Sequence, residues 1–308
     1  MKNINLHICI TGLHFMKSYE NIEHLVERIE KYKNINIKIN MIHDTTDTES
    51  YILKKALNKS KVASMINWVE YESKFLKSGH DFKSMNYASL IMQHEPLEHY
   101  LSLGISSNDY IFRCRGDYYL TDEFLKMILD EEFYLRLDNK KDNARILDKK
   151  IWVPYIGKSY FLHFCDYFFI LEAGCLKDIL ITNNKEASML WSDPYFNKDK
   201  KCFVERLFFT KPLLDFMKRD NINSISSEGY WDVLESNFCY GGDPSPIKTC
   251  FYGWRKSAWQ GLGNLGIKFD LNATRDEIRY FTKTIEKYSK IPENKVRYAL
   301  LSQDKFKF

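Results

Sequence analysis

The sequence predicts an α/β fold: a doubly wound, mostly parallel sheet flanked by helices, followed by a C-terminal helical extension. Two observations predict the sheet. The first 70 residues alternate between strand-like and helix-like patterns, and a β-prone apolar strand is expected again near residue 110. A capping box at Thr274–Glu277, followed by apolar residues at helical spacing, predicts the extension. We therefore expect one domain over residues 1–270 and the extension over 271–308.

The opening of the chain reads as strand, helix, strand, helix and strand. The strand-like segments are short and apolar or alternate apolar with polar residues, and the helical segments repeat apolar residues every three or four positions. This order is typical of a parallel sheet. We expect strands over 6–11, 35–41 and 62–69, and helices over 19–32 and 49–58.

Polar residues follow the first two expected strands. Thr11 and Gly12 end the first strand, and His43 and Asp44 open a polar loop after the second. Nucleotides bind at the carboxyl ends of strands in such sheets, so these four residues are candidates for a nucleotide pocket. Ordinary loop chemistry is the alternative for each of them.

The stretch 109–120 carries the strongest signal for function. It begins as a buried strand and then places Arg113, Arg115, Gly116 and Asp117 within five positions. The two arginines project to one face because strand side chains alternate, and buried charges need partners. Together these groups suit a phosphorylated ligand, with Asp117 placed to hold a divalent cation. A buried strand with a structural Arg–Asp pair is the alternative.

Two further carboxylates stand in apolar surroundings. Asp166 lies within an aromatic run, and Glu205 lies within an apolar helical stripe. A buried acid with a shifted pKa can deprotonate an attacking hydroxyl group, so both are candidate general bases. The alternatives are a strand-end cap for Asp166 and a plain surface position for Glu205. Elsewhere we expect a helix over 84–103 interrupted at Pro96, a helix over 121–132, a polar charged loop over 138–150 and a strand over 151–154.

The pattern of an apolar strand followed by Arg113-x-Arg115-x-Asp117 resembles GT-A glycosyltransferases of the capsule and lipopolysaccharide type, including the WavE-like group. The resemblance covers roughly residues 84 to 210. It extends to Ser84–Tyr87, Cys165–Phe169 and Val204–Leu207. One departure is plain, because the first acid of the usual Asp-x-Asp signature is Arg115 here.

The resemblance implies an enzyme that transfers a sugar from a nucleotide-diphosphate sugar to a glycan or lipid-linked glycan acceptor. Asn86 would lie near the donor at a helix N-terminus, and Asp117 would bind Mg²⁺ or Mn²⁺. Asp166 and Glu205 would act on the acceptor side of the cleft. Two alternatives are a sugar-phosphate or nucleotidyl transferase on a similar fold, and a glycan-binding protein without catalytic activity.

Composition restricts the partners and the location. The chain has 308 residues and a net charge of +4, which does not indicate a nucleic-acid-binding protein. Its seven cysteines include no Cys-x-x-Cys pair, which argues against a zinc site. Their odd number and the apolar contexts of several favour reduced thiols and a cytoplasmic protein. No signal-peptide pattern and no membrane-spanning apolar run is seen in the sequence. We therefore expect any membrane contact to be peripheral, at the inner face of the cytoplasmic membrane.

Overall fold

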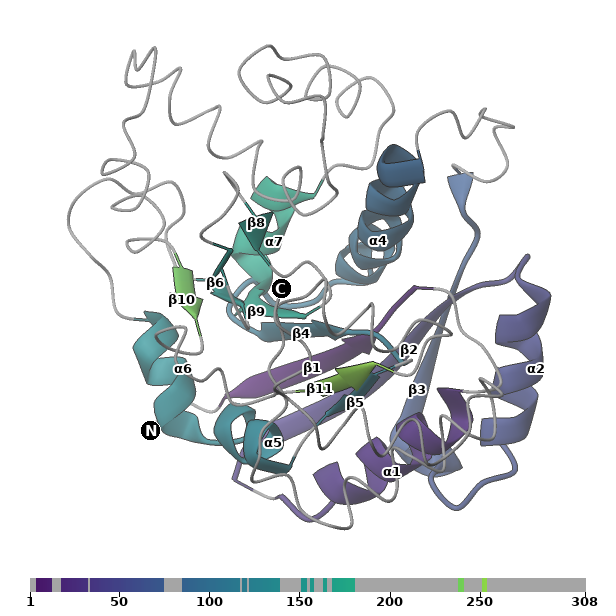
Figure 1. Cartoon of the computed structure of the whole chain (residues 1–308), viewed down its shortest axis with the longest axis horizontal. Helices are drawn as coiled ribbons and strands as arrows, with labels where there is room; N and C mark the ends of the chain where they lie inside the picture. The colour runs from purple at the N-terminus through teal and green to yellow at the C-terminus, as the bar shows by residue number, and fades with distance from the viewer. Residues whose placement is uncertain are drawn as a thin grey trace, which may run out of the picture.

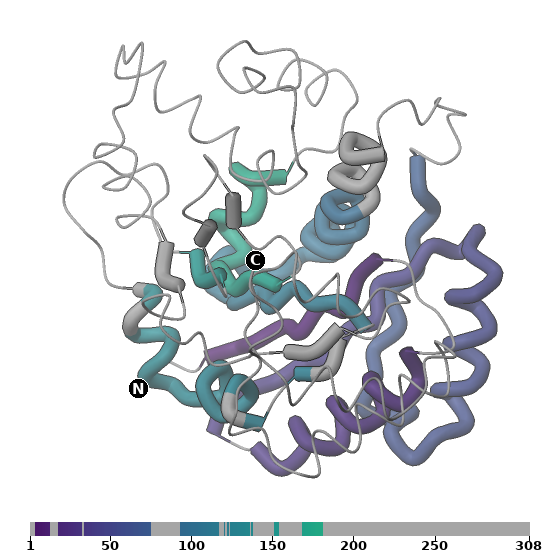
Figure 2. The backbone as a smooth tube through the Cα atoms, in the orientation of Figure 1, coloured from purple at the N-terminus to yellow at the C-terminus, as the bar shows by residue number. Residues whose placement is uncertain are grey.

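The computed structural model describes residues 4–12, 18–32, 34–74, 85–116, 118–120, 122–138, 151–153, 156–157, 163–164, 168–180, 238–240 and 251–253 (Figure 2). For residues 85–92 this description covers the backbone only. The extension expected over 271–308 lies outside the described residues.

The expected α/β architecture is confirmed (Figure 1). Seven strands form one sheet in the order β10-β6-β9-β4-β1-β2-β3. Neighbouring strands are parallel except at β9, which runs antiparallel to both β4 and β6. The strands of this sheet are β1 (Asn5–Ile10), β2 (Asn36–Asp44), β3 (Ile66–Tyr71), β4 (Tyr110–Cys114), β6 (Ile151–Val153), β9 (Phe169–Glu172) and β10 (Phe238–Tyr240).

Helices cover both faces of the sheet. In Figure 1, α4 lies on one side, and α1 and α5 lie on the other. The described helices are α1 (Tyr19–Ile29), α2 (Thr48–Leu57), α4 (Met85–Ser102), α5 (Asp122–Ile128), α6 (Glu131–Asp138) and α7 (Ala173–Ile179), with a short 3-10 turn η2 (Ala63–Met65). Two small antiparallel pairs join β5 (Tyr118–Leu120) to β11 (Phe251–Gly253) and β7 (Ile156–Gly157) to β8 (His163–Phe164).

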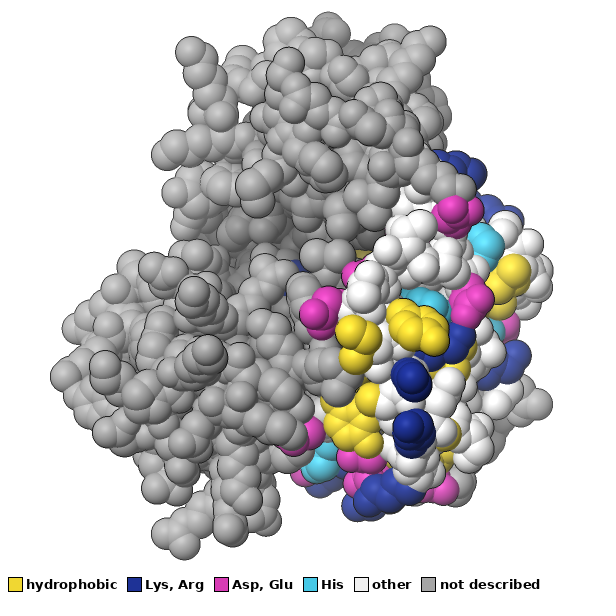
Figure 3. All heavy atoms as spheres, turned by 90° about the vertical axis from the view of Figure 1, so that its right-hand side faces the viewer, with side chains coloured by type: hydrophobic (Ala, Val, Ile, Leu, Met, Phe, Trp, Pro, Cys, Tyr) yellow, Lys and Arg dark blue, Asp and Glu magenta, His cyan; other side chains and the backbone are white. Residues whose placement is uncertain are grey.

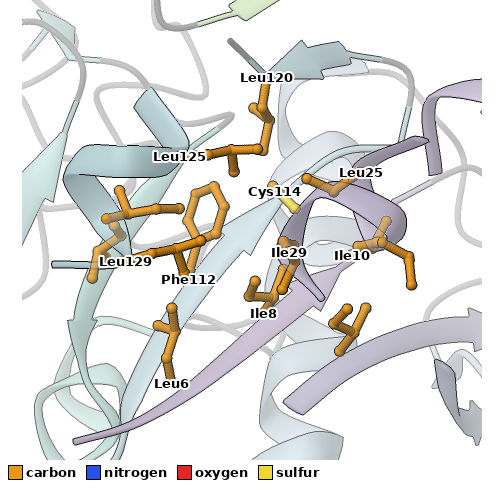
Figure 4. Packing of buried hydrophobic residues seen from close by; sticks show 14 of the residues in the cluster. Leu6, Ile8, Ile10, Leu25, Ile29, Phe112, Cys114, Leu120, Leu125 and Leu129 are labelled. Atoms are coloured by element: carbon orange, nitrogen blue, oxygen red, sulfur yellow. The ribbon is translucent and has the colours of Figure 1, made fainter. Parts of the chain in front are cut away.

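The main core lies between the sheet and the α1 and α5 side. Leu6, Ile8 and Ile10 alternate along β1 and contribute to this core together with Phe112 of β4 (Figure 4). The ring of Phe112 packs edge-on against Phe124 of α5, with the ring centroids 5.6 Å apart. Because side chains alternate along a strand, the residues between them face α4 instead.

A chain of buried hydrogen bonds joins the α4 face of β1 to α4. The Nε2 of His7 lies 3.1 Å from Oδ2 of Asp109, and its Nδ1 lies 2.6 Å from the hydroxyl of Tyr100. A carboxylate only accepts, so Nε2 donates to Asp109 and Nδ1 accepts from the Tyr100 hydroxyl. Asn5 donates from Nδ2 to the other oxygen of Asp109 at 2.8 Å. Burial lowers the pKa of His7, which favours this neutral form.

Three expectations about element boundaries were wrong. His43 and Asp44 belong to β2 rather than to a loop, because β3 continues far enough to pair with both of them. The helix α4 continues through Pro96, where burial of Leu97 and Tyr100 offsets the lost backbone hydrogen bond.

The helix expected over 121–132 is instead two helices, α5 and α6. The break falls at Asp130, whose side-chain Oδ1 accepts from the backbone N–H of Glu132 at 3.1 Å at the start of α6. An aspartate that bonds to the backbone in this way favours a helix start over a helix interior.

Candidate functional site

The carboxyl ends of β1, β2 and β4 lie next to one another. We call this border of the sheet, where these parallel strands end, the edge of the sheet; it is not an outer strand. Ile10 pairs with Met41 of β2 on one side and with Cys114 of β4 on the other. Both pairings are parallel, so all three strands run in the same direction. The antiparallel strand β9 begins at this edge, because Phe169 pairs with Arg113. The structure therefore brings together the ends of four strands, which is where ligands bind in open α/β sheets.

Thr11 joins the end of β1 to the end of β4 through two hydrogen bonds. Its backbone N–H donates to the carbonyl of Cys114 at 3.0 Å. Its side-chain Oγ1 accepts from Nε of Arg113 at 2.9 Å. Both side chains are buried, each with only 1% of its surface exposed. Thr11 and Arg113 thus lie beneath this edge of the sheet on the α4 face.

Gly12 extends the same edge toward solvent. Its φ of 101° is a conformation that residues with a Cβ rarely adopt. A Cβ placed on Gly12 would meet no atom of the described residues within 4 Å, so these residues leave space beside its backbone. A half-buried backbone with such space can approach a ligand closely.

Arg115 and Gly116 follow β4 directly and have different surroundings. Arg115 is half-buried. Gly116 is buried, and a Cβ there would lie 3.0 Å from Cδ1 of Ile22 and 3.5 Å from Cγ2 of Ile10. A side chain at residue 116 would therefore push against Ile22 of α1, and glycine avoids this contact.

Asp44 places a carboxylate at the end of β2. Its Oδ1 accepts from the backbone N–H of Thr46 at 2.9 Å and from the Thr46 hydroxyl at 2.8 Å. Its Oδ2 is buried and has no hydrogen-bond partner among the described residues. A buried oxygen is costly to leave unbonded, so Oδ2 retains the capacity to accept one hydrogen bond from a donor beyond the described residues.

His43 faces the opposite side of the sheet from Asp44. Its ring packs edge-on against Trp68, with centroids 5.5 Å apart, and its Nε2 lies 3.6 Å from Oε1 of Glu70. Burial lowers the pKa of His43, and the positive charge of Lys54 lowers it further. The imidazole is therefore neutral near pH 7 and lies on the α2 side. Asp44, and not His43, therefore lies on the same face of the sheet as Thr11.

The sequence reading missed Tyr71, which pairs with Asp44 in the sheet, and Glu95, whose charge acts on Tyr71. Burial raises the pKa of Tyr71, and the charges of Asp44, Glu95 and Asp47 raise it further. Glu95 of α4 accepts from the hydroxyl of Ser73 at 2.6 Å and from the backbone N–H of Lys74 at 2.7 Å. No local pattern in the sequence distinguishes these residues, because only the sheet register and the packing of α4 bring them together.

The structure does not describe the positions of the remaining candidate side chains relative to this edge of the sheet. Asp117, Asp166 and Glu205 lie outside the described residues, and of Asn86 only the backbone, in the first turn of α4, is described. Their predicted roles as metal ligand, general bases and donor contact stay predictions.

The residues placed at the end of β4 fit an anion better than a cation. Across the described part of the chain, no group of three or more His, Cys, Asp and Glu side chains is positioned to hold a metal ion. Arg113 and Arg115 instead bring two positive charges to this strand end. The described residues alone therefore do not provide a site for a divalent cation, and Asp117 stays our predicted ligand for one.

Comparisons with known proteins give weak structural similarities. No protein-family model matches the chain, and no curated protein matches it. The structure of the galactosyltransferase LgtC with donor and acceptor sugar analogues aligns over 94% of this chain and 98% of that one, at 8% identity and a TM-score of 0.44. The glycosyltransferase GlyE of Streptococcus pneumoniae aligns over 99% and 64%, at 8% identity and a TM-score of 0.36.

Residues 1–349 of S. aureus TarS align over 98% of this chain and 73% of that one, at 13% identity and a TM-score of 0.35. These TM-scores are too low to assign the chain to a family. Separately, the described helices include none with the length and apolar character needed to cross a bilayer.

Proposed function

We propose that the chain is a GT-A-like glycosyltransferase that moves a sugar from a nucleotide-diphosphate sugar to a hydroxyl group of a surface glycan, such as a capsule or lipopolysaccharide chain. One observation carries the proposal. A glycine turn with a positive φ and a cationic strand end lie at the same edge as a buried carboxylate with one oxygen unbonded. These groups complement the two halves of a nucleotide diphosphate.

The end of β4 and the turn after β1 suit the diphosphate. The described residues leave space beside the backbone of Gly12, and Arg115 stands directly after the neighbouring strand. A guanidinium group binds phosphate oxygens with paired hydrogen bonds and neutralises their charge. Charge develops on the diphosphate as it leaves, so a cation held in place there lowers the barrier to transfer.

The end of β2 suits the nucleoside. The unbonded Oδ2 of Asp44 would accept from an N–H of the base or an O–H of the ribose. Because Oδ1 is already held by Thr46, the carboxylate keeps one orientation before a ligand arrives. A fixed acceptor of this kind discriminates against ligands that offer no donor at that point.

In the transfer itself, the acceptor oxygen forms a bond to the anomeric carbon while the bond from that carbon to the phosphate oxygen breaks. The acceptor proton passes to a general base, and the nucleoside diphosphate leaves with the bonding electrons. Asp166 and Glu205 are our predicted bases. A divalent cation bound by Asp117 would add positive charge at the leaving diphosphate.

The test is a panel of nucleotide sugars scored by thermal shift and by product formation. A donor that binds the native state raises the melting temperature, and transfer releases a nucleoside diphosphate. Release of inorganic diphosphate or of a nucleoside monophosphate would indicate the nucleotidyl or sugar-phosphate transferase instead. Binding of glycans without turnover of any donor would indicate the inactive glycan-binding protein.

Asp117→Ala separates the role of the predicted metal ligand from that of the arginines. We expect transfer to be lost while the melting temperature stays close to that of the native chain. A chelator should slow the native enzyme, and added Mn²⁺ should restore it. Full activity of Asp117→Ala would exclude this aspartate from the site, whereas indifference to chelator would leave Arg115 as the main charge partner of the diphosphate.

A further inference from the structure

Arg113 is the largest of the fully buried side chains in the described part of the chain. With 1% of its surface exposed, its guanidinium group lies beneath the edge of the sheet rather than on it. A charged group is buried only where hydrogen bonds compensate for the lost water, and Thr11 is one of its partners. Arg115, two residues later, is half-buried and stands at the edge itself.

The contact between Arg113 and Thr11 affects the backbone of Gly12, the residue after Thr11. The Nε of Arg113 donates to Oγ1 of Thr11 at 2.9 Å, and the backbone N–H of Thr11 donates to Cys114 at 3.0 Å. Side chain and backbone of Thr11 are thus both bonded to β4. Gly12 comes next, at a φ of 101°, where the chain leaves the sheet. Glycine restricts its own φ and ψ less than any other residue, so a firmly held neighbour such as Thr11 helps to fix its conformation.

We infer that Arg113 is a positioning residue: it holds Thr11, and through Thr11 it fixes the Gly12 turn against which the diphosphate binds. This inference rests on the proposed function for the ligand, and on the structure alone for the turn. It assigns different roles to two arginines that the sequence presents as a pair. Arg115 meets the ligand, and Arg113 orders the backbone that meets it.

The experiment is a double-mutant cycle of Thr11→Val, Arg113→Met and the combined variant. Valine keeps the shape of threonine and removes the hydroxyl acceptor. Arg28→Met is the matched control, since Arg28 is also buried and donates to Asp122 at 2.6 Å and to the carbonyl of Leu120 at 2.5 Å, near the far end of α1. Unfolding, amide hydrogen exchange over residues 4–12 and donor affinity are measured for each variant.

We expect exchange over residues 4–12 to accelerate in Thr11→Val and in Arg113→Met, and to stay native-like in Arg28→Met once the lower global stability is allowed for. We expect donor affinity to fall about tenfold in each of the first two variants, and no further in the combined one, because both remove the same restraint. Arg28→Met should lower stability and leave affinity unchanged.

The inference is overturned by native-like exchange in both variants. It is also overturned if Arg113→Met loses affinity while Thr11→Val binds like the native chain, since Arg113 would then act on the ligand by another route. If the native chain binds no nucleotide sugar, the proposed function fails, but the exchange measurement still decides whether Arg113 orders the turn.

Discussion

Replacing Gly12 with alanine should strain the backbone and also weaken ligand binding. The same replacement at Gly104 should produce the strain alone, so comparing the two variants separates the effects. The chain supplies its own control, because Gly104 has a φ of 85° and Gly12 a φ of 101°, and a Cβ at either position would meet no atom of the described residues within 4 Å. Neither alanine clashes with these residues. The cost is therefore conformational, and we expect about 1–3 kcal/mol for each substitution.

For a chain of 308 residues, an unfolding entropy of about 2.1 cal/mol/K per residue means that 1 kcal/mol corresponds to roughly 1.5 °C in melting temperature. Both variants should therefore melt a few degrees below the native chain. Gly12 lies at the candidate site, whereas Gly104 follows α4 at the other edge of the sheet. We expect donor binding to weaken in Gly12→Ala only, because the strained turn relaxes away from the diphosphate.

Thermal and chemical unfolding give the stability of each variant, and calorimetric titration with the nucleotide sugar found in the donor panel gives the affinity. A native-like melting temperature for Gly12→Ala would refute the strain argument. Equal losses of stability with native affinity in both variants would refute the placement of the diphosphate at Gly12.

Two further predictions concern stability. Desolvation lowers the pKa values of His7, His24 and His43, that of His24 to about 4, so at these three residues the unfolded chain binds more protons than the folded one. Stability should be constant above the unfolded pKa of about 6.5 and should fall as the pH drops from there toward 4; a urea midpoint that does not change over this range would contradict it. Gly116→Ala should cost roughly 1–3 kcal/mol, because its Cβ would lie 3.0 Å from Cδ1 of Ile22. The combined variant with Ile22→Val removes that atom and should regain part of the loss in urea unfolding, while no recovery would place the strain elsewhere.

Much of the first half of the fold could be predicted from the sequence because the signals there are local. Apolar periodicity locates β1, α1, β2 and α2 to within a few residues. The expected strand edge also brings Thr11, Gly12 and Asp44 to the same end of the sheet as Arg113. The expected loop at His43 was wrong because the length of β2 depends on β3, a partner that the local sequence does not reveal.

The roles within the site could not be predicted in the same way. Two arginines separated by one residue look equivalent in the sequence, yet one is buried against Thr11 and the other stands at the edge. The function of Gly116 in packing depends on Ile22, which is almost a hundred residues earlier in the chain. Periodicity shows which face of an element is buried, but it does not show which distant side chain will meet a given residue there.

The polar contacts of His7 have a consequence for how α4 is aligned. Apolar packing tolerates small slides of a helix along a sheet, whereas hydrogen bonds from Tyr100 to His7 and from His7 to Asp109 are satisfied at a single depth. An all-apolar replacement of this trio would therefore be expected to keep the helix docked but to let its far end drift lengthwise. That far end is the amino terminus of α4. The hydrogen bonds of His7, near the carboxyl terminus of α4, would therefore determine how far the amino terminus of the helix extends along the sheet.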